Sequence, residues 1–196
     1  DGLFILSLVH CLMKAGKIDL DYLAKFTNAA CLVNDDASSE SYGLILRDEA
    51  GKEMVMDRET HHRVPFDQKG VNPDLTGRWR HAGITYRTVM SLMADRYMSN
   101  DYAPEVVGPV IGMDANRIRR VAAELAEVAF DQAIEIAQPW TDFRGEKHDK
   151  MIGRPVAFHA MRGISAHSNG FQTCRALHLL QIILGSVEVP GGFRFK

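Results

Sequence analysis

The sequence predicts an α/β fold, and three observations lead to that class. Apolar residues recur at three- and four-residue spacing over Leu3–Ala15, Ala115–Phe130 and Phe171–Leu184, which predicts helices. Short apolar runs lie between the helices, and Pro155–Met161 has the length of a buried strand bounded by glycines. Helices that alternate with short strands in the second half of the chain favour layered α/β packing.

The first helix carries sequence signals at both of its ends. Asp1 precedes the apolar run, so we expect its side-chain oxygen to accept from a free amide of the first turn. Gly16 follows the run and is typical of a helix C-terminus. A second short helix is predicted from Asp19 to Phe26.

A small β-hairpin insertion is predicted next. Tyr42–Arg47 and Glu53–Asp57 are rich in strand-forming residues, and the five residues between them include Gly51, which suits a tight turn. Glu59–Trp79 contains proline and glycine without periodicity, and we expect it to form a long surface segment.

The middle of the chain is predicted to be a helical layer. Helical spacing extends over Tyr86–Met98 and Ala103–Ile111, and Asp114 precedes the third helix as a capping residue. Ile134–Ala137 is then expected to be a short strand, and a segment of mixed charge separates it from Pro155–Met161.

The polar loop Arg162–Gly170 is the densest group of hydrogen-bonding side chains in the chain. It contains two glycines, two serines, an asparagine, a histidine and an arginine. A strand, a glycine-containing polar loop and a helix in that order favour binding of nucleotide-like anions, because free amides point out of the helix N-terminus. An ordinary solvated connection between a strand and a helix explains the same residues.

The composition excludes several classes of protein. The 196 residues include 46% hydrophobic and 24% charged residues, which describes ordinary globular material. A formal net charge of -2 gives no support for nucleic-acid binding. The three cysteines lack CxxC spacing and the adjacent His61 and His62 lack partners, so no metal ligands are expected. No start methionine precedes Asp1, and we expect an internal piece of a longer polypeptide.

Four ordered stretches resemble the large subunit of molybdopterin oxidoreductases of the dimethyl-sulfoxide-reductase family. They are Asp1-Gly2 with its apolar helix, residues 101–107 with 113–122, residues 161–170, and residues 184–192. Trp140-Thr-Asp and the run from His159 to Phe171 most resemble the catalytic subunit of cytoplasmic sulfite-oxidising complexes.

The resemblance implies a bis(molybdopterin guanine dinucleotide) cofactor with molybdenum, held between α/β domains. Relatives often carry Met-Gly-x-x-Gln-His in the loop: Gly163 and His167 match this pattern, whereas Arg162 and Ala166 depart from it. An arginine at that position suits a pterin or pyrophosphate oxygen. The residues expected to contact the cofactor are Asp1, Arg162, Gly163, Ser165, His167 and Asn169.

The same resemblance implies how the chain fits into a larger protein. Residues 1–152 are expected to belong to one cofactor-binding domain and residues 153–196 to the adjoining one. The metal ligand, a cluster-binding N-terminal region with iron–sulfur cysteines and a C-terminal domain lie elsewhere, so no catalytic residue is expected here and the isolated segment should be inactive.

The expected partners are the rest of the polypeptide, together with separate iron–sulfur electron-transfer and membrane-anchor subunits at the cytoplasmic side of a membrane. Sulfite oxidation is the leading hypothesis. Reduction of thiosulfate, polysulfide or an arsenic oxyanion, a nucleotide-binding α/β module without catalysis, and a helical interaction domain are the alternatives.

Overall fold

The computed structural model describes residues 1–194, and its contacts divide the chain into two compact units. The first unit contains Asp1–Asp19, Arg96–Trp140 and the residues from Asp149 onward. The second contains Leu20–Asp95 and Thr141–His148. The start of the chain and residues 153–194 therefore share one unit, while the assignment of residues 1–152 and 153–196 to two cofactor-binding domains stays a prediction.

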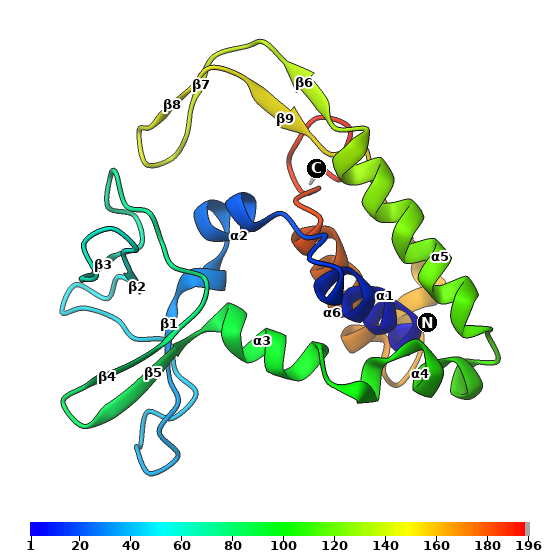
Figure 1. The fold of residues 1–196 in the computed structure, drawn as a ribbon, viewed down its shortest axis with the longest axis horizontal. Coiled ribbons are helices and arrows are strands. Elements are labelled where there is room, and N and C mark those ends of the chain that lie inside the picture. Colours follow the sequence, from blue (N-terminus) through cyan, green and yellow to red (C-terminus); the bar gives the residue numbers. More distant parts are fainter. Residues whose placement is uncertain (195–196) are drawn as a thin grey trace. The chain divides into compact units, whose positions relative to one another are not determined.

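The first unit is built around helix α1 (Gly2–Lys14), which packs against α4 (Pro104–Ile111), α5 (Ala115–Ala126) and α6 (Gly170–Ile183) (Figure 1). These helices have apolar residues at helical spacing, and burying those faces together drives their association. The largest side chains that are fully buried in this core are Leu12, Ile118, Leu180, Ile183 and Leu184. The four helices predicted in this unit are confirmed, with ends within a few residues.

The ends of α5 and α1 differ in how they are capped. The side chain of Asp114 accepts from the backbone N–H groups of Asn116 and Arg117, as the sequence predicted. At its other end α5 continues into a π-helical turn, η3 (Glu127–Asp131). Asp1 occupies the N-cap position of α1, but only its backbone carbonyl accepts, from Ile5 N–H at 3.0 Å. The predicted side-chain cap at Asp1 is therefore wrong.

The strands of the first unit form a ribbon of β6 (Ile134–Ile136) and β9 (Met151–Gly153), which pair antiparallel. The ion pair of Lys150 with Glu135, 2.7 Å, joins the two arms at the surface. The short 3₁₀ turns η2 (Asn100–Tyr102) and η4 (Arg162–Ser165) precede α4 and α6.

The second unit contains a three-stranded antiparallel sheet in the order β1-β5-β4. Its strands are β1 (Leu32–Asn34), β4 (Arg78–His81) and β5 (Ile84–Thr88), and Leu32, Met56 and Tyr86 form a buried cluster against it. The unit also contains the hairpin of β2 (Met54–Met56) and β3 (Arg63–Pro65), the helix α2 (Leu20–Phe26) and the 3₁₀ turn η1 (Asn28–Ala30). The short strands β7 (Trp140–Thr141) and β8 (Lys147–His148) pair with each other. The boundary between the units falls within β7, after Trp140. Helix α3 (Val89–Tyr97) follows β5 directly.

Two predictions for the second unit need correction. The turn after Arg47 forms, with Gly51 at φ +82°, but Tyr42–Arg47 makes only isolated bridges and β2 pairs with β3 instead. The segment Glu59–Trp79 therefore supplies strands as well as surface loops. Tyr86 lies in β5, not in the predicted helix, because cross-strand pairing with Asn34 and Trp79 outweighs local helical spacing.

Pro155–Met161 is not a strand, and this prediction is wrong. The segment has no regular secondary structure, and Val156 is its one buried residue. A strand needs a neighbour for its backbone hydrogen bonds, and within residues 1–194 no strand pairs with this segment. The mixture of helices and strands agrees with the α/β class, but the sheets are small and antiparallel.

Candidate functional site

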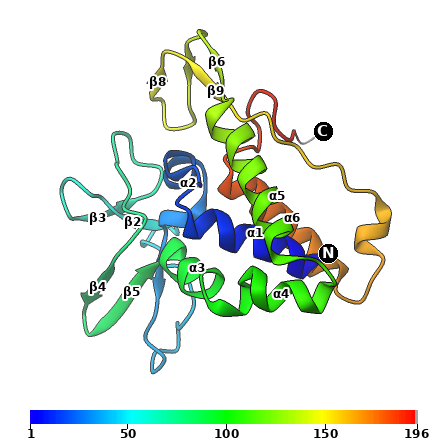
Figure 2. The same cartoon turned by 45° about the vertical axis from the view of Figure 1, so that its right-hand side comes forward.

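The predicted cofactor-binding loop lies at the surface of the first unit, between the extended segment and α6 (Figure 2). Arg162, Gly163, Ser165, His167 and Asn169 are all exposed. The 3₁₀ turn η4 orders the first half of the loop, where the Ser165 hydroxyl donates to the Arg162 carbonyl at 2.9 Å. All five predicted site residues of the loop are thus accessible to solvent.

The two glycines of this loop have opposite environments. A Cβ on Gly163 would meet no atom within 4 Å, and its φ lies outside the left-handed region, so neither fold nor backbone conformation requires glycine there. A Cβ on Gly170 would lie 2.1 Å from the carbonyl oxygen of Ser165. Gly170 therefore lets the loop close on the start of α6, whereas Gly163 leaves open space beside an exposed backbone.

The N-terminus of α6 meets the N-terminus of α1. A Cβ on Gly2 would lie 3.2 Å from Thr173 Oγ1, which is in the first turn of α6. Asp1 is therefore at the same end of the α1–α6 pair as the loop. Asn169 is the N-cap of α6, and its side chain makes no capping hydrogen bond to the helix amides.

The stretch of sequence that contains this loop carries charged side chains of one sign. No aspartate or glutamate occurs from residue 150 to residue 187, whereas this stretch contains one lysine, three arginines and three histidines. Arg162 and His167 are exposed within it. Exposed donors beside the N-terminus of a fourteen-residue helix suit an anionic ligand such as a pyrophosphate. The donor set and the open space at Gly163 leave room for such an anion at the backbone.

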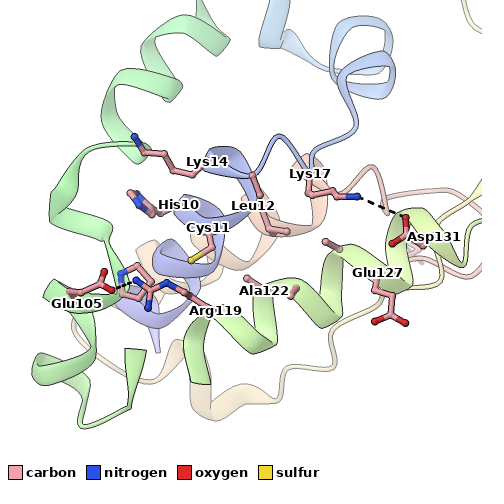
Figure 3. Close-up of a pocket in the computed structure, with 14 residues that line it drawn as sticks. His10, Cys11, Leu12, Lys14, Lys17, Glu105, Arg119, Ala122, Glu127 and Asp131 are labelled. Atoms are coloured by element: carbon pink, nitrogen blue, oxygen red, sulfur yellow. Dashed lines mark hydrogen bonds and ion pairs between the residues drawn. The ribbon is translucent and has the colours of Figure 1, made fainter. Parts of the chain in front are cut away.

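A second feature of the first unit is a groove of about 810 Å³ between α1 and α5 (Figure 3). Its floor is formed by Leu12 and alanines of α5, and an ion pair lies at each end. Arg119 pairs with Glu105, and Lys17 lies 3.9 Å from Asp131. Its lining contains three cationic side chains and three carboxylates, so the groove offers little net charge to an anion.

His10 and Cys11 line this groove but do not form a catalytic pair. The Nδ1 of His10 donates to the carbonyl oxygen of Tyr97 at 3.0 Å, which fixes the proton on that nitrogen. Burial raises the pKa of the Cys11 thiol, although Arg119 opposes the effect. A thiol held in its neutral form is a poor nucleophile. Both residues lie in the helix that the sequence predicted over Leu3–Ala15. The sequence gave no signal for the groove, because helices that are distant in sequence form it.

The described residues offer neither a metal cluster nor a membrane span. Residues 1–194 contain no group of three histidine, cysteine, aspartate or glutamate side chains arranged to hold a metal ion. None of the helices in the same residues is both long enough and apolar enough to cross a bilayer.

Comparison with known proteins shows a clear similarity over the whole chain. The chain is 39% identical, over an alignment of 206 positions, to a subunit of the sulfite dehydrogenase of Allochromatium vinosum. The alignment covers 100% of this chain and 21% of that protein, so the chain spans about a fifth of the length of its relative. No protein-family model matches the chain. The chain is therefore similar throughout to one portion of a sulfite dehydrogenase subunit.

Proposed function

We propose that the chain is the part of a molybdopterin-dependent, sulfite-oxidising enzyme that holds one arm of the cofactor. The similarity of the whole chain to the sulfite dehydrogenase of Allochromatium vinosum carries this proposal. The loop before α6 supports it, because it combines exposed donors with an absence of acidic residues over residues 150–187.

Each residue of the proposed site has a chemical role that its position allows. Arg162 would donate charge-assisted hydrogen bonds to a pterin or pyrophosphate oxygen, and His167 and Asn169 would add further donors. Gly163 would let the ligand approach the backbone without a side chain between them. Asp1, at the same end of the α1–α6 pair, would accept from donor groups of the cofactor.

The reaction itself would depend on groups outside this chain. When bound, the molybdenum cofactor would supply the two-electron oxidation in which sulfite gains an oxygen atom from water and two protons are released. The residues of this chain bind and orient the cofactor and shield it from solvent. We propose that electrons pass to a separate iron–sulfur protein, that a membrane anchor holds the complex on the cytoplasmic side, and that another region of the polypeptide carries an iron–sulfur cluster.

Two alternatives from the sequence remain distinguishable by experiment. A related enzyme that reduces thiosulfate, polysulfide or an arsenic oxyanion would contain the same cofactor but would not oxidise sulfite. A nucleotide-binding module without catalysis would purify without molybdenum. The full-length protein is therefore purified, and its molybdenum, pterin and sulfite-dependent reduction of an electron acceptor are measured.

Substitutions in the loop then test the site. We expect Arg162→Ala to weaken cofactor binding by about 1.5–3 kcal/mol, roughly a 10- to 100-fold change, through the lost charge-assisted hydrogen bond. Gly163→Val should lower cofactor occupancy by steric exclusion, and His167→Ala should lower it through a lost donor. Arg120→Ala is the matched control, because Arg120 is exposed on α5 and forms an exposed ion pair with Glu124 at 3.4 Å.

The measurement is molybdenum and pterin content per folded protein, with circular dichroism as the control for folding. If all three loop variants keep the cofactor content of Arg120→Ala, the loop is an ordinary connection and the site assignment fails. The similarity to a sulfite dehydrogenase would remain, but other residues would have to bind the cofactor.

A further inference from the structure

A partly buried ion pair holds the start of the segment that leads to the loop. Arg154 Nε and Nη2 both donate to Asp19 Oδ2, at 2.9 and 2.7 Å, and the two side chains are only 16% and 12% exposed. Arg154 Nη1 also donates to the Ala129 carbonyl at 3.1 Å, and its guanidinium lies 4.8 Å from the centroid of the Phe130 ring. These contacts fix the guanidinium in position and orientation, which an ammonium group cannot reproduce.

The other partner of the pair is attached to the C-terminal end of α6. The Asp19 N–H donates to the carbonyl of Ile183 at 2.8 Å. Gly185, at φ +66°, approaches the same aspartate so closely that a Cβ would lie 2.6 Å from Asp19 Oδ2. The pair therefore places the start of the segment at the end of the helix that the segment will later enter.

Residues 155–169 then return to the N-terminal end of α6 (Figure 2). A helix of fourteen residues is about 21 Å long, so the segment has to travel this distance along the unit. Val156 is 6% exposed, but every residue from 157 to 169 is half-buried or exposed. Little side-chain packing fixes the path between the two ends.

The far end of the segment is held by backbone contact. The Gly170 N–H donates to the His167 carbonyl at 2.9 Å, and the Ser165 carbonyl lies against Gly170. The segment is thus held at its start by Arg154 and at its end by the close approach at Gly170. A change at either end should alter the position of the exposed residues between them.

We infer that Asp19 and Arg154 are positioning residues for the loop Arg162–Gly170. Their ion pair restrains the segment so that the loop donors stay in place before a ligand binds. Ordering the loop in advance reduces the entropy that binding would otherwise cost. The restraint is a property of this chain alone, whereas its benefit for cofactor binding rests on the proposed function.

The test uses the full-length protein and has a readout that needs no cofactor. Trypsin cleaves after Arg162 in the loop and after Arg175 in α6, and both residues are exposed. Release of the two sets of peptides is followed by mass spectrometry for Asp19→Asn and Arg154→Lys. Asp131→Asn is the control, because Asp131 forms an exposed ion pair with Lys17 at 3.9 Å.

We expect cleavage after Arg162 to accelerate by roughly tenfold or more in both variants, which corresponds to about 1.4 kcal/mol in the opening of the loop. Cleavage after Arg175 should match that of the control. A rate at Arg162 equal to the control overturns the inference, and so does an increase that Arg175 shares, because a shared increase reports general unfolding.

A third variant covers the case in which loss of the buried charge prevents folding. Gly185→Ala keeps both charges but places a Cβ against the carboxylate of Asp19, so we expect selective cleavage at Arg162 there as well. Cleavage in Gly185→Ala that matches the control overturns the inference.

Cofactor content separates this inference from the proposed function. Selective cleavage with lower pterin content in Asp19→Asn supports both. Selective cleavage with unchanged pterin content refutes the benefit for cofactor binding. If the wild-type protein contains no pterin, the proposed function is refuted, and the cleavage rates still show whether the ion pair restrains the loop.

Discussion

The carbonyl oxygen of Ser165 occupies the space where residue 170 would carry its Cβ. A Cβ built on Gly170 lies 2.1 Å from that oxygen and 2.8 Å from the Cα of Ser165, so backbone meets backbone. Gly163, in the same loop, has open space on its Cα. The fold therefore requires glycine at residue 170 but not at residue 163.

Alanine at these two positions should have different effects on stability. Gly170→Ala forces the loop away from α6, and we expect it to lower the free energy of unfolding by about 1–3 kcal/mol. Gly163→Ala should change it by no more than about 0.5 kcal/mol. Urea unfolding followed by circular dichroism measures both values, and equal effects would contradict the close approach at Gly170.

Two aspartates at helix N-termini provide a second comparison. Asp114 accepts two backbone N–H groups at the start of α5, so Asp114→Ala should cost about 1 kcal/mol of stability. Asp1 makes no side-chain capping bond, and Asp1→Ala should leave the unfolding midpoint unchanged. Thermal unfolding of the two variants checks this order. A larger loss at Asp1 would show that its carboxylate supports the helix after all.

The carboxyl group of Asp142 makes stability depend on acid pH. Burial by itself would raise its pKa, since the side chain is 3% exposed, but hydrogen bonds from His148 Nε2 and from the backbone amides of Glu146 and Arg144 lower the pKa below its ordinary value. A depressed pKa in the folded state contributes stability above the unfolded pKa of about 3.9. This contribution is lost as the pH falls through the lower, folded value.

In Asp142→Asn the free energy of unfolding should therefore depend less on pH in the acid range. At neutral pH the variant should be less stable by about 1–3 kcal/mol, because hydrogen bonds to a charged acceptor are weakened. Asp21→Asn is the control, as the Asp21 side chain is 75% exposed and pairs with Lys25 one turn away. Unfolding midpoints between pH 2.5 and 7 are compared, and parallel curves for wild type and Asp142→Asn would contradict the prediction.

The sequence located correctly those elements whose determining residues lie close together in the chain. α5 was predicted by apolar spacing and by Asp114, and both act within one or two helical turns. The register of β5 depends on Asn34 and Trp79, which come from separate strands. Helical spacing at Val89, Met93 and Tyr97 led to a predicted helix that began at Tyr86, so local spacing gave the wrong element for residues 86–88.

The prediction of a strand at Pro155–Met161 was wrong for a different physical reason. Its apolar composition predicted a strand, but hydrogen bonds to a neighbouring strand decide whether such a segment is one. The candidate loop, in contrast, is a dense run of polar residues and glycines in the sequence, and its polar residues are exposed in the structure, while their role in binding stays a prediction. The Asp19–Arg154 pair escaped prediction because its members are 135 positions apart in sequence.

The thiol of Cys31 should resist alkylation in the folded protein. The residue is 1% exposed, and burial, together with the negative charge of Glu53, raises its pKa to about 11 against the opposing effect of Arg47. At pH 8 about 0.1% of a thiol with this pKa is thiolate, compared with about 10% at the ordinary value of 9.0, so reaction should be at least 100-fold slower. The folded state keeps a proton that the unfolded chain releases, and the stability from this group therefore falls as pH rises from 9 toward 11. Iodoacetamide labelling with peptide mapping measures the rate at Cys31, with urea-unfolded protein as the control. Labelling of Cys31 at the same rate in both states would show that the thiol is neither buried nor held in its neutral form.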